Sequence, residues 1–159
     1  IIDVLNSTNF NGEKISLCLI GSPSSPKETS VLFRINDFVK KNDARWISIL
    51  PRISRDALPA KLIEFDCFIH AYRGSLDKVL IEATMCGLPV VTVNQEYISE
   101  FGSWSGLDNP SLSDELDAFL RSSQNFVTFK VKENREIAVE KHSMEGWLIR
   151  LVEVLNGNV

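Results

Sequence analysis

The sequence predicts an α/β protein with a Rossmann-like fold, in which helices cover both faces of an open parallel sheet. Two observations lead to this prediction. Four short apolar runs are nearly continuous rather than alternating, which is typical of parallel strands buried on both sides. Helical patterns separate these runs, as expected for right-handed strand–helix–strand crossovers. The four runs are Ile15–Ile20, Trp46–Leu50, Asp66–Ala71 and Pro89–Val93.

The helices are predicted from apolar residues that recur three or four positions apart. In the first of them, Leu32, Ile35, Phe38 and Val39 fall on one face. Such a face suits packing against a sheet, and the same pattern continues after the last strand. The expected helices are Thr29–Lys41, Arg55–Phe65, Ser75–Cys86, Leu112–Arg121, Lys132–Glu140 and Met144–Leu155.

The loops that follow the strands are where a ligand is expected, because open α/β sheets bind ligands beyond the carboxyl ends of their strands. Phe126–Lys130 alternates weakly and is a candidate short strand outside this pattern. The loops expected at the strand ends are Gly21–Pro26, Pro51–Ser54, Tyr72–Ser75 and Asn94–Phe101.

Composition limits both the organisation and the function classes. With 159 residues and 44% hydrophobic content, residues 1–159 are expected to form one domain. The net charge of −4 argues against a nucleic-acid partner, which needs clustered Lys and Arg. Two histidines without a ligand cluster argue against a metal site. No signal peptide or membrane-length apolar run is visible, and Cys18, Cys67 and Cys86 suit reduced thiols, so a cytoplasmic location is expected.

The stretch from Gly74 to Val91, GSLDKVLIEATMCGLPVV, contains the candidate site. A Gly-Ser turn before a helix offers free backbone N–H groups that suit a phosphate, although Ser75 is equally an ordinary N-cap. Asp77 is expected in the first helical turn. Glu82 follows Lys78 by four residues, so the two form either an exposed ion pair or part of a hydroxyl-binding site.

The same stretch resembles the donor-site segment of retaining glycosyltransferases of family 4, which have the GT-B fold. Ile49–Ile69 is similar to the segment that precedes it in that family, and Val139–Leu155 is similar to the closing helices. The resemblance covers about half of the chain in the correct order. It implies the C-terminal, donor-nucleotide-binding half of a GT-B enzyme. The N-terminal acceptor domain, with the usual catalytic His, is then expected outside these 159 residues.

The resemblance also implies a role for Glu82. In the family, the second Glu of an E-x7-E pattern binds the ribose hydroxyls, and Glu82 matches that position. The first Glu, which contacts the donor sugar, falls at Gly74, so this sequence departs from the pattern there. Asp77 or the backbone N–H groups of residues 75–78 are candidate substitutes.

Other residues match the family's donor site by position. Gly74, Ser75 and Leu76 match the loop whose backbone approaches the diphosphate. Lys78 and Arg73 are candidates for charge near that diphosphate. The last three expected contacts lie near the base, although Leu58 is equally a plain core residue. These three are Arg52, Ile53 and Leu58.

The function implied by the resemblance is transfer of a sugar from a nucleotide diphospho-sugar, UDP- or GDP-linked, to a glycan, lipid or other acceptor. The anomeric configuration would be retained, and no cofactor or tightly held metal would be needed. Such enzymes act in polysaccharide biosynthesis, in the cytoplasm or at the inner face of the membrane. No catalytic residue is expected in this chain, which alone is expected to be inactive.

Two alternatives remain from the sequence. The missing Glu at Gly74 suits a degenerate glycosyltransferase-like domain kept for binding. A sugar-nucleotide 2-epimerase of GT-B fold is the nearest enzyme alternative, although its own His and acidic catalytic set is not found.

Overall fold

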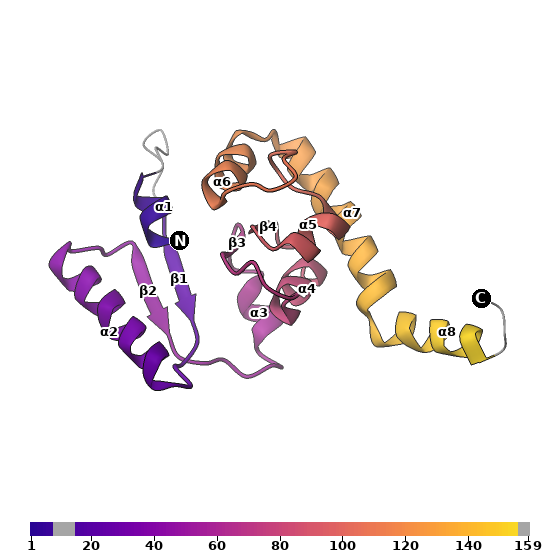
Figure 1. Ribbon diagram of the computed structural model, residues 1–159, viewed down its shortest axis with the longest axis horizontal. Helices are drawn as coiled ribbons and strands as arrows, with labels where there is room; N and C mark the ends of the chain where they lie inside the picture. Colours follow the sequence, from indigo (N-terminus) through magenta and orange to yellow (C-terminus); the bar gives the residue numbers. More distant parts are fainter. Residues whose placement is uncertain (8–14, 156–159) are drawn as a thin grey trace. The chain divides into compact units, whose positions relative to one another are not determined.

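The chain is a mixed α/β protein in the computed structural model, which describes residues 1–7 and 15–155 (Figure 1). All four predicted strands are confirmed, each with shorter bounds than the apolar run that predicted it. The strands are β1 (Leu17–Ile20), β2 (Ile47–Leu50), β3 (Phe68–His70) and β4 (Val90–Thr92). The helices are α1 (Ile2–Ser7), α2 (Pro26–Lys41), α3 (Leu58–Leu62), α4 (Lys78–Met85), α5 (Gln95–Phe101), α6 (Leu112–Arg121), α7 (Gln124–His142) and α8 (Met144–Leu155).

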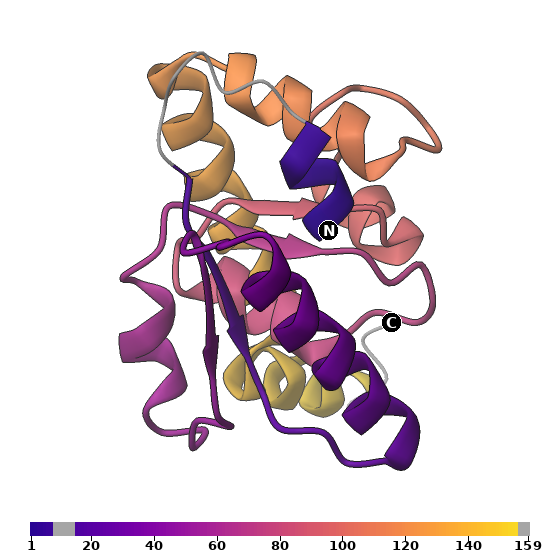
Figure 2. The same cartoon turned by 90° about the vertical axis from the view of Figure 1, so that its left-hand side faces the viewer.

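The strands form two parallel pairs. β1 pairs with β2, with Leu17 opposite Ile47, and the two strands lie side by side in Figure 2. β3 pairs with β4, with His70 opposite Thr92. Each pair is joined through a helix, as the sequence predicts for strand–helix–strand units. Among the described residues the pairing therefore gives two two-stranded sheets.

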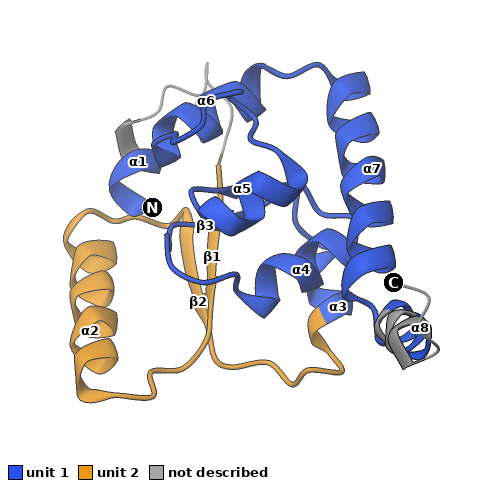
Figure 3. Ribbon diagram, turned by 45° about the vertical axis from the view of Figure 1, so that its right-hand side comes forward, with its two compact units in different colours: residues 1–8, 59–159 blue, residues 9–58 orange. Residues whose placement is uncertain are grey.

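Two compact units divide the chain (Figure 3). Unit 1 contains residues 1–8 and 59–159, and unit 2 contains residues 9–58. Each unit holds one of the parallel strand pairs, so each can be described from its own contacts.

Unit 2 contains β1, β2 and helix α2. Pro26 stands in the first turn of α2, where its missing N–H costs no helical bond, and Ser25 caps the helix. The predicted apolar face of α2 is confirmed, because all four of its residues are half-buried and the opposite side is exposed. These four residues are Leu32, Ile35, Phe38 and Val39.

The core of unit 1 surrounds β4, whose three residues are all buried. Helix α4 contributes Leu80, Ala83 and Thr84 to this core, and it packs against α7. Helix α6 packs against β4. The indole N–H of Trp104 donates to the Val90 carbonyl at 2.7 Å, which attaches the segment before α6 to the strand.

A buried carboxylate organises the loop that precedes α6. Glu115 is 1% exposed and accepts hydrogen bonds from the Trp104 N–H at 2.8 Å and from the Ser105 N–H at 3.0 Å. The Ser105 hydroxyl also donates to it at 2.6 Å. Lys130 approaches the same loop and donates to the Ser103 carbonyl at 2.6 Å. Burial lowers the pKa of the Lys130 amine, while the charge of Glu115 opposes that shift.

Two predictions about secondary structure are wrong. Phe126–Lys130 is not a strand but part of α7, which begins after the N-cap Ser123 and is longer than the predicted Lys132–Glu140. Asn94–Phe101 is not a loop, because α5 occupies Gln95–Phe101 with Asn94 as its N-cap. In both segments a side-chain cap starts the helix, at Ser123 and at Asn94. At Phe126–Lys130 this outweighs the weak alternation of the sequence.

Candidate functional site

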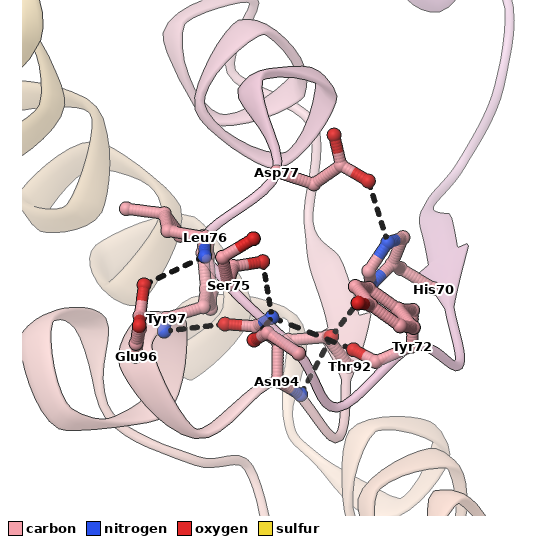
Figure 4. Close-up of polar contacts among 10 residues, drawn as sticks. His70, Tyr72, Ser75, Leu76, Asp77, Thr92, Asn94, Glu96 and Tyr97 are labelled. Carbon is pink, nitrogen blue, oxygen red and sulfur yellow. Dashed lines mark hydrogen bonds and ion pairs between the residues drawn. The ribbon is translucent and has the colours of Figure 1, made fainter.

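The segment Tyr72–Asp77 connects β3 to α4 and lies at the carboxyl end of β3, where the sequence predicts a ligand. Asn94 follows the neighbouring strand β4. Because β3 and β4 are parallel, the two strand ends meet at one edge. Figure 4 shows the side chains that gather there.

The side chain of Asn94 fixes the path of this segment. Asn94 is fully buried, and its amide nitrogen lies 2.8 Å from the Gly74 carbonyl oxygen and 3.2 Å from that of Ser75. A longer contact of 3.4 Å reaches the Tyr72 carbonyl. Its amide oxygen accepts the Tyr97 N–H at 2.9 Å and caps α5. The sequence reasoning did not identify Asn94, although an Asn between a strand and a helix is a recognisable cap signal.

The carbonyls held by Asn94 determine where the N–H groups of the segment point. In a planar trans peptide the N–H and the C=O point in opposite directions. The N–H groups of Ser75 and Leu76 are therefore directed away from Asn94. The Leu76 N–H donates to a carboxylate oxygen of Glu96 at 2.6 Å (Figure 4). The resemblance implies a diphosphate near this N–H, which in the structure is bonded to an anionic oxygen.

Gly74 is covered by the side chain of Tyr72. A Cβ atom built on Gly74 would overlap the Tyr72 ring, so any larger residue there requires the ring to move. The ring itself is 60% exposed. Gly74 therefore has no carboxylate, and the Tyr72 ring occupies the space that a side chain at this position would need.

Ser75 does not cap α4, which corrects the sequence prediction. The helix begins at Lys78 with Asp77 as its N-cap, and the Asp77 side chain makes no capping hydrogen bond. The contacts of Asn94 and Glu96 hold Ser75 and Leu76 in a non-helical path, which delays the helix start. Gly87 follows the C-cap Cys86 with a φ of 76°, which is typical of the residue after a C-cap.

The Asp77 carboxylate faces His70 instead of the helix end. Its Oδ2 atom lies 3.5 Å from Nε2 of His70, and the side chains are 52% and 12% exposed, respectively. The Nδ1 atom of His70 lies 3.3 Å from the Thr92 hydroxyl oxygen. His70 therefore contacts a buried hydroxyl on one side and a half-exposed carboxylate on the other.

The two basic candidates are either bonded to another loop or exposed. The Arg73 guanidinium donates to the Pro110 carbonyl at 2.8 Å and to the Asn109 side chain, in the loop before α6. Lys78 is exposed on the first turn of α4.

Glu82 is half-buried on α4, on the side turned away from the buried Leu80. Its charge contributes to a raised pKa of the Cys86 thiol, after the larger effect of burial. Lys78, four residues earlier, lies on the same side of the helix. The structure therefore brings Gly74, Ser75, Leu76 and Asp77 together in one segment, with Glu82 in the helix that follows it.

The three remaining predicted residues belong to unit 2. Arg52 and Ile53 follow β2, and the Arg52 N–H donates to the Ser22 hydroxyl at 3.1 Å. This bond joins the loops that follow β1 and β2, as expected for neighbouring parallel strands. Leu58 is half-buried at the start of α3. A single site shared by these three residues and those of unit 1 stays a prediction.

An open groove lies elsewhere in unit 1. It measures about 1030 Å³ and is lined by residues before β3 and β4, including Asp66 and Pro89, and by α6 and α7, including Phe119 and Arg135. It is therefore at the amino ends of the strands, and none of the predicted site residues lines it.

The described residues contain no group of three or more His, Cys, Asp or Glu side chains that could hold a metal ion. Burial raises the pKa of the Cys67 thiol to about 11, which disfavours a thiolate nucleophile there. Across residues 1–7 and 15–155, no helix has both the length and the apolar character needed to cross a membrane.

No protein-family model matches this sequence, and no curated protein and no solved structure matches it. The resemblance to family 4 glycosyltransferases therefore stays an expectation from the residues themselves.

Proposed function

We propose that this chain binds a nucleotide diphospho-sugar and forms the donor half of a retaining glycosyltransferase. The observation that carries the proposal is the segment between β3 and α4. Asn94 holds its carbonyls, so that the N–H groups of Ser75 and Leu76 point to the opposite side. The diphosphate is proposed to bind these N–H groups.

The contact between Glu96 and Leu76 supports an anion-binding role for this side of the segment. A carboxylate oxygen accepts the Leu76 N–H at 2.6 Å, and a phosphate oxygen presents the same acceptor chemistry. The N-terminus of α4 begins two residues later and adds a partial positive charge. A bound diphosphate would replace the Glu96 carboxylate at this N–H.

Glu82 is proposed to bind the ribose. A carboxylate can accept hydrogen bonds from two vicinal hydroxyls, and each such charged bond is stronger than a neutral one. Arg52, Ile53 and Leu58 are proposed to face the base, with UDP or GDP as the nucleotide. Arg73 and Lys78 would supply charge once they leave their present positions.

The proposal includes a complete open sheet. The pairs β1–β2 and β3–β4 would belong to one parallel sheet with helices on both faces, and the carboxyl ends of all four strands would share one edge. Nuclear Overhauser contacts between a strand of one pair and a strand of the other would test this. Their absence would leave two separate sheets.

The whole enzyme would transfer the sugar to a glycan or lipid-linked acceptor held by an N-terminal domain. It would act in the cytoplasm or at the inner face of the membrane. Helix N-termini and basic side chains would stabilise the leaving diphosphate, which removes the need for a tightly held metal. The present chain would bind the donor but not turn it over.

Three contacts favour the degenerate alternative, a binding domain without transferase activity. Glu96 occupies the Leu76 N–H, Tyr72 covers Gly74, and the Arg73 guanidinium is bonded to the segment before α6. Each contact competes with a feature that the donor would use. Rate measurements on the full-length protein separate the two functions, since only the enzyme consumes a nucleotide sugar.

The test of donor binding is a calorimetric or NMR titration of this chain with UDP, GDP and ADP. Wild type is expected to prefer one nucleotide, and Glu82→Gln is expected to weaken that binding about tenfold, as loss of charged hydrogen bonds predicts. Glu136→Gln is the matched control, because its exposed carboxylate lies on α7 and it should bind like wild type. Equal affinity in wild type and Glu82→Gln would remove Glu82 from the site. Failure of wild type to bind any nucleotide would refute the proposed function for this chain.

A further inference from the structure

Helix α7 runs along the outer side of unit 1 in Figure 3 and forms one wall of the open groove. Leu120 of α6 and Val139 of α7 line this groove, and each is 46% exposed. Val127 and Val131 of α7 also line it and are half-buried. The groove therefore leaves apolar side chains of two helices open to water, as interaction surfaces commonly do.

Two opposite charges stand beside these apolar residues on α7. Nζ of Lys132 lies 3.9 Å from Oε1 of Glu136, one helical turn later, and the two side chains are 78% and 69% exposed. A pair this exposed adds little to the stability of its own helix, because water and salt screen it. Arg135 is held differently, since its Nε donates to the Met85 carbonyl at 2.9 Å. Lys132 and Glu136 are thus open to a partner.

The order of these side chains on α7 is complementary to its own reverse. Two antiparallel copies of α7, with a two-fold axis between residues 134 and 135, bring Lys132 of each copy beside Glu136 of the other. The same axis brings Val131 of each copy beside Val139 of the other. Both matches hold to within the rise of one residue, about 1.5 Å along the helix. Parallel copies would instead place like charges together, which is unfavourable, so the charges select the antiparallel arrangement.

We propose that this groove binds a second copy of the chain, through antiparallel pairing of α7. A two-fold interface needs a surface that is complementary to itself, and the charges of α7 meet that condition. Val139 of each copy would enter the groove of the other beside Leu120, while Lys132 and Glu136 would form two ion pairs across the interface. The segment Tyr72–Asp77 lies at the opposite ends of the strands, so it would stay accessible in the dimer. The inference does not depend on the proposed function.

Sedimentation equilibrium of the 159-residue chain over a series of concentrations measures the dissociation constant of the dimer. Wild type is expected to dimerise, and the dimer should weaken as NaCl is added, because its ion pairs are screened. Lys132→Glu and Glu136→Lys each turn two attractive contacts into two repulsive ones. Each variant is expected to raise the dissociation constant about tenfold. Arg34→Glu, which reverses an exposed charge on α2, is the matched control and should dimerise like wild type.

A mixture of the two charge variants separates the interface from the helix itself. The Lys132→Glu chain carries two acids at these positions and the Glu136→Lys chain carries two bases, so neither keeps the ion pair within α7. In an antiparallel dimer with one chain of each kind, both contacts across the interface are attractive again. The mixture is therefore expected to form a heterodimer with about the affinity of wild type, although each variant alone associates weakly.

Leu120→Asp tests the apolar part of the interface. It places a charge in the buried centre of the dimer and is expected to prevent association, while circular dichroism checks that the exposed substitution leaves the fold intact. A wild-type chain that stays monomeric at every concentration would overturn the inference. A dimer with the same dissociation constant in both charge variants would overturn it as well, because it would use another surface. Failure of the mixed variants to associate would exclude the antiparallel pairing and so contradict the proposal.

Discussion

The two units hold the loops at their strand ends in different ways. In unit 1 a fully buried amide, Asn94, contacts three carbonyls of the segment Tyr72–Asp77. In unit 2 the Arg52 N–H, in the loop after β2, donates to the exposed Ser22 hydroxyl at 3.1 Å. Strand burial separates β4, which is wholly buried, from β1, β2 and β3, which are mostly half-buried.

This difference shows that the backbone of the Tyr72–Asp77 segment is more strongly fixed by its contacts than the loop after β2. A buried polar group without a partner loses about 1–3 kcal/mol, so Asn94 fixes the path of the segment that it contacts. An exposed hydroxyl can exchange its partner for water at little cost. The strand-end loop of unit 1 is therefore preorganised, whereas that of unit 2 is expected to adapt to a ligand. The predictions below test this contrast, beginning with the largest effect.

The largest loss of stability is expected for Glu115→Ala in unit 1. The change leaves the Trp104 and Ser105 N–H groups without their acceptor in a buried loop, and it removes a negative charge near Lys130. We expect the free energy of unfolding, measured with urea, to fall by about 3 kcal/mol. Asp117→Ala on the same helix is the control and should cost less than about 0.5 kcal/mol. A cost for Glu115→Ala no larger than that of the control would contradict the anchoring role.

Asn94→Ala should have the second largest effect. It removes both the cap of α5 and the contacts with the Tyr72–Asp77 segment, for a loss of about 2 kcal/mol. The matched change in unit 2 is Asn42→Ala, because that exposed amide also donates to a carbonyl, of Phe38, at 2.8 Å. Asn42→Ala should cost less than about 0.5 kcal/mol, since water replaces an exposed partner.

Asn94→Asp sharpens the same test. It keeps the oxygen that caps α5 and loses the N–H₂ donors to Gly74 and Ser75. Amide shifts should then concentrate in residues 72–77, with α5 little changed. Equal shifts in both segments would mean that the cap, and not the carbonyl contacts, fixes the loop.

The elements that the sequence predicts best are those whose signals are local. The bounds of α6 and α8 agree with the prediction, and α6 begins at a capping box of Ser111 and Asp114. The four apolar runs likewise identify the strands. A strand that is covered on both faces needs apolar residues at consecutive positions, and this pattern is visible in the sequence. The side-chain caps at Ser123 and Asn94 are local signals as well, and reading them would have corrected the strand and loop predicted there.

The start of α4 could not be found in this way. It depends on Asn94 and Glu96, which lie about twenty residues after the segment that they hold. No local rule predicts that these side chains would place the N-cap of α4 at Asp77 and not at Ser75. For the same reason the sequence could propose Gly74, Ser75 and Asp77 as a site but could not predict the contact between His70 and Asp77. Long-range polar contacts of this kind are where a single sequence is least informative.

The smallest effect is expected at the N-terminus of α2, where the contacts in unit 2 are local and exposed. The Glu28 carboxylate accepts hydrogen bonds from the backbone and hydroxyl of Ser24, and these bonds lower the pKa of Glu28 below its usual 4.5. A lowered folded-state pKa means stability that is present above pH 4.5 and is lost as the pH falls through the folded value. Glu28→Gln should therefore lower the protection factors of the amides in the first turn of α2 at pH 7, and its difference from wild type should shrink as the pH falls below 4.5. A difference in protection between wild type and Glu28→Gln that stays the same as the pH falls, or a change that reaches the Tyr72–Asp77 segment, would contradict this contrast between a locally held loop and an anchored one.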